Sequence, residues 1–442
     1  MKTGLGSHFT YKKLVGFTLP TIAMMIFSSI YCVVDGFFVS NFAGKTPFAA
    51  VNIIYPFIMI LGSIGFMFGT GGSALIARTM GEGDLKKATR YFSLFVYTSL
   101  IIGVAISALG IIFIRPVASL LGADGELLEC CVKYGRIILL ANPAFILQME
   151  FQSFFVTAEK PKLGLAVTLI SGVTNMVLDA LFVAVFSLGL EGAAAATAIS
   201  QLLGGIIPLI YFVLPNKSLL RLSKTKFDGK ALFKASTNGC SELLNQISMS
   251  LVSMIYNIQL LKFAGENGVA AYGVLMYVCF VFLAIFIGFS VGSAPVVSFH
   301  FGAGNSPELK SLLKKSLVII GVVSVAMVIL SESLSKPLSL LFTGYDEELL
   351  ALTSRAFIIF SFSFLFSGFA IFFSGFFTAL NDGLTSATIS FLRTLVFQII
   401  SVLTLPLVFG IDGVWFSMVI AEFLAVIAGI ILLIIKKNKY HY

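Results

Sequence analysis

The sequence predicts an all-α polytopic membrane protein: twelve transmembrane helices in two parallel six-helix repeats, related by a pseudo-twofold axis along the membrane normal. Three observations support this fold class. Apolar residues make up 58% of the chain and charged residues only 11%, with a mean hydropathy of +1.01, whereas soluble domains carry about 25% charged residues. Twelve apolar runs can each cross a hydrocarbon core of about 30 Å. The chain also matches itself at an offset of 221 residues, half of its 442.

The apolar runs follow one another with short polar connections. In the first half they cover 14–42, 47–77, 91–121, 131–157, 163–188 and 192–214. In the second half they cover 231–261, 269–299, 312–341, 349–379, 384–409 and 411–435. None alternates with period two, as strands of a membrane barrel would. The first run is too long for a signal peptide and contains Pro20 and Asp35, so we expect it to stay attached.

The internal repeat is clearest at turns and glycines, where identical residues return at the offset of 221. Phe42–Gly44 returns as Phe263–Gly265, and Gly81 and Gly83 return as Gly302 and Gly304. Because six spans are an even number, both halves enter the membrane in the same direction. We therefore divide the chain into an N-lobe (1–214), a basic linker (215–234) and a C-lobe (235–442). Two lobes around a central path are typical of transporters.

Basic residues predict the orientation, since loops in the cytoplasm carry the excess of Lys and Arg. One side has Lys12, Lys13, Arg78, Lys86, Lys87, Arg90, Lys160, Lys162, the linker bases and Lys436, Lys437 and Lys439. The other side has far fewer. We expect a multi-pass protein of the bacterial cytoplasmic membrane with both termini in the cytoplasm. The net charge of +8 then reflects topology and not nucleic-acid binding.

Acidic residues inside the spans are candidate functional groups, because a charge at mid-membrane costs at least about 2.5 kcal/mol. Asp35 and Asp179 each lie nine residues before the end of their helix, about 14 Å deep at 1.5 Å per residue. Asn175 shares a helix face with Asp179, and Thr197 returns to a similar depth. These four side chains offer hard oxygen ligands for a small cation such as Na⁺, or a carboxylate for a proton.

The repeat provides an internal control for this cation site. Asp35, Asn175, Asp179 and Thr197 correspond to Tyr256, Val396, Ile400 and Met418 in the second half. The polar set is therefore present in one lobe only, as a coupling site would be. The alternative is that these polar groups merely tie helices together.

Other residues complete the candidate list. Pro20 removes a helix hydrogen bond and marks either a hinge or a static kink. Glu242 and Gln246 are candidates for a substrate cleft, although Glu242 near a helix end also suits pairing with a lysine. Glu150 lies between two glutamines that share a helix face; it either lines the cleft or extends along a neighbouring helix. The five cysteines have no metal-ligand spacing.

Four segments resemble the multidrug and toxic compound extrusion (MATE) family, and the resemblance extends over nearly the whole chain. They are Val34–Val39, Gly81–Asp84, Asn175–Asp179 and Gly189–Thr197. The resemblance implies two six-helix lobes enclosing a cleft, with drug export driven by re-entry of protons or sodium ions. The paired aspartates resemble the N-lobe cation site of the branch named for a DNA-damage-inducible protein, which gives the four N-lobe residues the coupling role.

We therefore expect an antiporter, not an enzyme, that exports lipophilic organic cations in exchange for H⁺ or Na⁺ and needs no cofactor. It would act as a monomer surrounded by membrane lipids. The alternative is a flippase for a lipid-linked saccharide, which would need a cluster of cationic residues for phosphate groups. Arg136, Arg355 and Arg393 lie in or beside spans, but the sequence shows no evident cluster.

Overall fold

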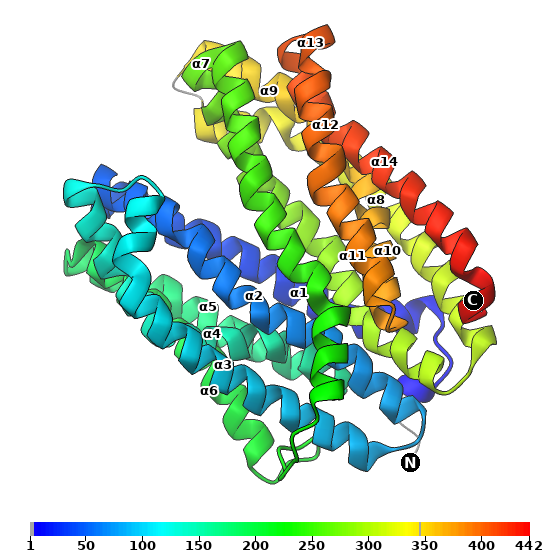
Figure 1. The fold of residues 1–442 in the computed structure, drawn as a ribbon. Coiled ribbons are helices and arrows are strands. Elements are labelled where there is room, and N and C mark those ends of the chain that lie inside the picture. The colour runs from blue at the N-terminus through cyan, green and yellow to red at the C-terminus, as the bar shows by residue number, and fades with distance from the viewer. Residues whose placement is uncertain (1–3, 344–345) are drawn as a thin grey trace.

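The computed structural model describes residues 4–343 and 346–442, which form helices joined by short turns (Figure 1). The first half contains α1 (Tyr11–Phe38), α2 (Lys45–Gly81), α3 (Leu85–Leu120), α4 (Gly125–Thr157), α5 (Pro161–Asp179) and α6 (Gly189–Val213). The second half contains α7 (Gly229–Gly302), α8 (Ser306–Thr343), α9 (Glu347–Ser361), α10 (Phe364–Ala379), α11 (Gly383–Phe391), α12 (Phe397–Thr404), α13 (Pro406–Phe409) and α14 (Ile411–Tyr440).

These helices group into the twelve expected spans within the described residues. Ten helices are long and apolar enough to cross a membrane, and α9 with α10 forms an eleventh span bent by 50°. The long α7 divides at Gly265, whose φ of 59° and ψ of −148° are not helical. Gly44, at the same repeat position, has φ of 103° between α1 and α2. Only glycine adopts such angles readily, so the sequence repeat fixes a turn in both halves.

The linker is shorter than its predicted bounds of 215–234. Residues 214–228 are not helical, but α7 already begins at Gly229. Asp228 explains this start, because its side chain accepts hydrogen bonds from the backbone N–H groups of Lys230 and Ala231. Such an N-cap satisfies donors that the first turn leaves free.

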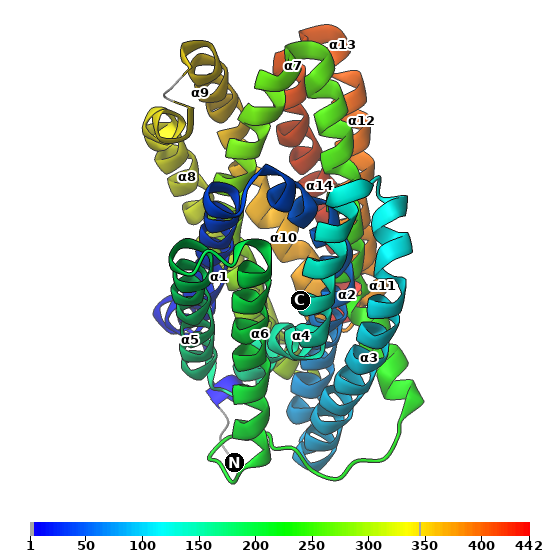
Figure 2. The ribbon, with the colours of Figure 1, turned by 90° about the vertical axis from the view of Figure 1, so that its left-hand side faces the viewer.

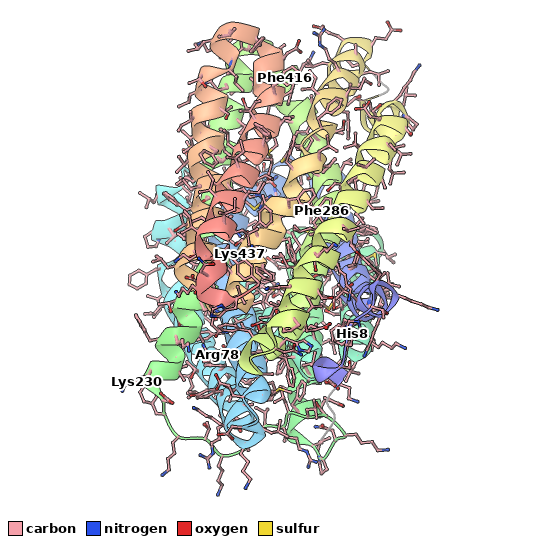
Figure 3. The ribbon with its side chains drawn as sticks, turned by 90° about the vertical axis from the view of Figure 1, so that its right-hand side faces the viewer. His8, Arg78, Lys230, Phe286, Phe416 and Lys437 are labelled. Atoms are coloured by element: carbon pink, nitrogen blue, oxygen red, sulfur yellow. The ribbon has the colours of Figure 1, made fainter. Side chains whose placement is uncertain are left out.

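Two bundles, α1–α6 and α7–α14, meet at one end of the molecule and diverge toward the other (Figure 1), and Figure 2 shows the first bundle face-on. Arg78, Lys230 and His8 lie toward the end where the bundles meet, and Phe416 lies toward the opposite end (Figure 3). We call the end formed by the turn between α2 and α3, the linker and the start of α8 the basic end.

Glycines allow α2 and α7 to touch backbone to backbone at this junction. A Cβ on Gly81 would lie 2.0 Å from the carbonyl oxygen of Phe299, and one on Gly302 would lie 2.0 Å from that of Arg78. Gly81 and Gly302 are repeat equivalents, so each lobe contributes the same contact to the other. The crossing therefore holds the two lobes in close contact near the basic end.

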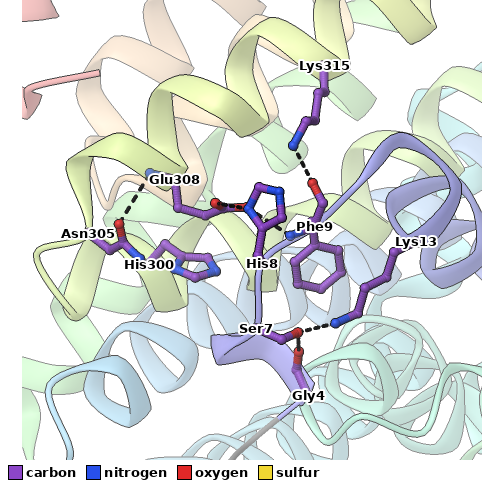
Figure 4. A network of polar contacts seen from close by, with 9 residues as sticks. All are labelled: Gly4, Ser7, His8, Phe9, Lys13, His300, Asn305, Glu308 and Lys315. Atoms are coloured by element: carbon purple, nitrogen blue, oxygen red, sulfur yellow. Dashed lines mark hydrogen bonds and ion pairs between the residues drawn. The ribbon is translucent and has the colours of Figure 1, made fainter.

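The N-terminal strap, residues 4–10, ties the two lobes together at the same end (Figure 4). The Leu5 N–H donates to Glu159 Oε1 of the N-lobe at 2.8 Å, and the Phe9 N–H donates to Glu308 Oε1 of the C-lobe at 2.9 Å. His8 Nδ1 lies 2.7 Å from Glu308 Oε2. The Leu5 and Phe9 side chains are fully buried. The strap thus adds polar and apolar contacts that close the basic end.

Candidate functional site

Asp35, Asn175, Asp179 and Thr197 come together in the N-lobe, as their depths predicted. Asp35 lies in the last turn of α1, Asp179 is the last residue of α5, and Thr197 is on α6. Thr197 Oγ1 donates to Asp35 Oδ1 at 3.3 Å, and Asn175 Nδ2 donates to Thr197 Oγ1 at 3.5 Å. The Asp179 carboxyl lies within hydrogen-bonding reach of Asp35. We call these four residues the N-lobe acid site.

Three buried acceptor atoms of this site have no donor among the described residues. They are both carboxyl oxygens of Asp179, which is 0% exposed, and the amide oxygen of Asn175, which is 1% exposed. Buried acceptors are normally satisfied, because leaving one unpaired costs about 1–3 kcal/mol. A proton shared between the carboxyls, or a small cation among the oxygens, would satisfy them. The site is therefore chemically suited to bind either.

Both aspartates precede a local change of helix type. The π-helix Ala180–Val185 begins directly after Asp179, and the π-helix Val39–Ala43 begins one turn after Asp35. π-helical turns are rare and are often found at functional sites. Both π-helices lie between the acid site and the end of the lobe opposite the basic end.

In the C-lobe, two residues at the equivalent positions are linked through Gln398. Tyr256, the counterpart of Asp35, is 2% exposed and donates its hydroxyl to Gln398 Oε1 at 2.8 Å. Gln398 Nε2 in turn lies 2.8 Å from the sulfur of Met418, the counterpart of Thr197. Ile400, the counterpart of Asp179, is exposed on the surface of the C-lobe. Among the described residues of the C-lobe, the four equivalent positions therefore hold no pair of carboxyl groups.

Comparison with known proteins identifies the fold and the family. The sequence profile of the MatE family matches residues 20–181 and 243–404, one segment in each lobe. The chain belongs to the MatE family. The profile covers Asp35, Asn175 and Asp179, and its second segment begins just after Glu242.

Named relatives of this MatE-family chain are bacterial export proteins. It is 25% identical to the "Multidrug export protein MepA" of Staphylococcus aureus strain MRSA252, over 97% of this chain and 94% of the relative. It is 28% identical to the protein of the same name from Staphylococcus haemolyticus, over 71% of this chain and 69% of the relative. A solved structure described as the outward-facing conformation of a multidrug resistance MATE family transporter matches with a TM-score of 0.93 and 22% identity, covering 99% and 97% of the two chains.

The remaining predicted residues lie apart from the acid site. Glu242 and Gln246 lie one turn apart on α7 and are partly exposed, with Glu242 within hydrogen-bonding reach of Asn245. Glu150 is 0% exposed inside the N-lobe, and neither of its carboxyl oxygens has a firm partner in the described chain. In this conformation α2 and α3 cover Glu150, and the choice between the substrate cleft and a path along a neighbouring helix stays a prediction. Gly69 of α2 packs directly on the Glu150 backbone.

The sequence reasoning missed a polar chain that leads from the acid site toward the basic end. Ser171 Oγ donates to the Ser200 carbonyl at 2.6 Å, and Gln148 Nε2 lies 3.5 Å from Ser171 Oγ. Gln148 and Gln152 line a small cavity of 10 Å³, about the space that one water molecule requires. The signal was present as the glutamine face of α4, but its partners come from helices distant in sequence.

An ion pair buried in the C-lobe was also missed. Arg393 Nε donates to both carboxyl oxygens of Glu422, at 2.9 and 3.0 Å. Their side chains are 14% and 4% exposed. This acid therefore has a cation supplied by the protein, whereas the Asp35–Asp179 pair has none among the residues that the structure describes.

Proposed function

We propose that this MatE-family chain is a secondary antiporter that exports lipophilic organic cations in exchange for protons or sodium ions by alternating access. The observation that carries the proposal is the N-lobe acid site, where two carboxyls are neighbours and three buried oxygens have no donor within the described part of the chain. Two carboxylates repel each other in a low dielectric, so binding a proton or Na⁺ is favourable there. The relatives are named multidrug export proteins, which supports the export of drugs as the process that ion binding drives.

The coupling ion is proposed to be a proton, with Na⁺ as the alternative. The Asp35 and Asp179 carboxyls are close enough to share one proton. Asn175 and Thr197 complete an oxygen set that also suits Na⁺. Glu242, with Gln246 one turn further along α7, supplies negative charge for a cationic substrate.

Helix α1 links ion binding to the contact between the lobes. It carries Asp35 near one end, while a Cβ on Gly292 of the C-lobe would meet Thr18 near the other, at 3.2 Å. Pro20 lies between them inside the helix, where it removes one backbone hydrogen bond. A change of charge at Asp35 that bends α1 at Pro20 would therefore change the contact that closes the basic end.

The proposed orientation places the basic end, the linker and both termini in the cytoplasm of a bacterial cell, according to the excess of Lys and Arg. The bundles meet at that end, so this conformation is closed to the cytoplasm. After ion binding the contact would open, and substrate would enter from the cytoplasm.

The structure offers no support for the flippase alternative. Two of the three arginines that a phosphate site would need are already paired with carboxylates, Arg355 with Asp412 at 2.5 Å and Arg393 with Glu422. Arg136 is exposed on a different lobe. The described residues therefore bring no two of these arginines together as free charges.

Transport in sealed proteoliposomes tests the proposal. Proton and sodium gradients are imposed separately, and movement of a quaternary ammonium dye is followed. We expect dye transport against its gradient with one ion and not with the other. Absence of transport with both ions, together with movement of a lipid-linked saccharide, would replace this proposal with a flippase.

A further inference from the structure

A basic groove of 450 Å³ lies outside the acid site, between α8 and α14 at the basic end. It is lined by Lys310, Lys314 and Lys437, together with Leu313, Leu317 and Tyr442. Helix α10 packs against both α8 and α14, and Figure 3 shows Lys437 on α14 beside these helices. The three lysines are exposed.

The lysines of the groove lack carboxylate partners, unlike their neighbours. Asp382 Oδ2 lies 3.7 Å from Lys436 Nζ and 3.9 Å from Lys439 Nζ. Burial opposes ionisation of Asp382, but hydrogen bonds from Tyr440 and Thr385 hold its pKa below the usual range, so it stays charged. Within residues 4–343 and 346–442, no carboxylate lies within 4.0 Å of the Lys310, Lys314 or Lys437 nitrogens. The groove therefore has an uncompensated positive charge.

An exposed apolar stripe continues from the lysines along each helix. On α8 it follows Lys310 and Lys314 at helical spacing as Val318, Val322, Val325 and Ile329. On α14 it leads away from Lys437 as Ile434, Ile430, Ile427 and Phe423. Val318 to Ile329 spans about 16 Å, close to the roughly 15 Å of one hydrocarbon leaflet. Each helix thus presents cations at the depth of the headgroups and apolar side chains at the depth of one leaflet.

We infer that this groove binds the phosphate headgroup of an anionic phospholipid from the leaflet at the basic end, with its acyl chains along the stripes of α8 and α14. Basic pockets between transmembrane helices at the cytoplasmic face are suited to anionic lipid headgroups. Lys310 and Lys314, one turn apart, reach the phosphate from one wall, and Lys437 reaches it from the other. The Tyr442 ring is held by Phe376, with centroids 5.2 Å apart, and fixes the end of the groove.

Native mass spectrometry of the purified full-length protein with added phosphatidylglycerol or phosphatidylcholine tests this site. The test variant combines Lys310→Gln, Lys314→Gln and Lys437→Gln. A matched control combines Lys217→Gln, Lys224→Gln and Lys226→Gln in the exposed linker, with the same change of charge. We expect the wild type and the control to retain phosphatidylglycerol over phosphatidylcholine, and the test variant to bind it roughly tenfold more weakly or worse.

Three results would overturn the inference. They are equal retention of phosphatidylglycerol by the test and control variants, equal binding of both lipids by the wild type, and displacement of the lipid by millimolar inorganic phosphate. Arginine at the same three groove positions keeps the charge, so that variant should bind like the wild type and shows that the groove still folds. Weak binding by the arginine variant would also contradict the assignment.

Discussion

Replacing Asp179 with Asn should make the protein more stable while abolishing its transport. The Asp179 carboxyl is fully buried, and neither oxygen has a donor among the described residues. Each unsatisfied buried acceptor costs about 1–3 kcal/mol. An asparagine amide removes the charge and can donate to the nearby Asp35 carboxylate. We therefore expect the free energy of unfolding to rise by about 1–3 kcal/mol, most clearly at alkaline pH and low sodium, where no ion fills the site.

The assay is the apparent melting temperature of the detergent-purified protein, measured beside dye transport in proteoliposomes. Tyr256→Phe is the matched control, because it changes the repeat counterpart of Asp35 and leaves the buried Gln398 Oε1 without its donor. That control should lower stability by about 1–3 kcal/mol and keep coupled transport. A lower melting temperature in Asp179→Asn at alkaline pH would refute the reasoning, since Asp179 would then be a structural tie between helices.

The other predictions concern the basic end. A cysteine at Lys226 should be labelled only from the cytoplasm, and labelling from outside intact cells would reverse the orientation. Gly302→Leu should destabilise the close contact of α2 and α7 by about 1–3 kcal/mol and raise hydrogen exchange at residues 83–85. The control Gly273→Leu, which has open space around it, should do neither. Equal hydrogen exchange in the two variants would contradict the contact. Glu308→Gln removes the charge that faces His8, so limited chymotrypsin digestion after Phe9 of the N-terminal strap should become faster. An unchanged rate would mean that the strap does not depend on the His8–Glu308 pair.

The sequence was sufficient for the architecture because the repeat and the apolar runs are local patterns. The positions of Gly44 and Gly265 already indicated the two equivalent turns, and in the C-lobe the turn is the break of α7 at Gly265. The acid site could also be predicted, since depth along a helix follows from a fixed rise per residue. Equal depth along the helices places three side chains at one level in the membrane, those of Asp35, Asp179 and Thr197.

Contacts between distant segments were beyond that reasoning. Nothing near Glu308 in the sequence points to His8, 300 residues earlier, so the strap could not be foreseen. The pairing of Arg393 with Glu422 needed the packing of η4 (Leu392–Val396) against α14. The sequence left two positions open for Glu150, because the periodicity of one helix gives a direction for each side chain but does not say which helix covers it.

The most direct test of the central claim is to measure which ion, H⁺ or Na⁺, the protein releases when a cationic substrate binds. The purified protein is mixed with a quaternary ammonium dye in weakly buffered solution, and proton release is followed with a pH indicator, with displacement of radioactive Na⁺ measured in parallel. We predict release of one kind of ion by the wild type and by Tyr256→Phe, and none by Asp35→Asn combined with Asp179→Asn. The same release from the double aspartate variant would show that the coupling ion binds outside the N-lobe acid site.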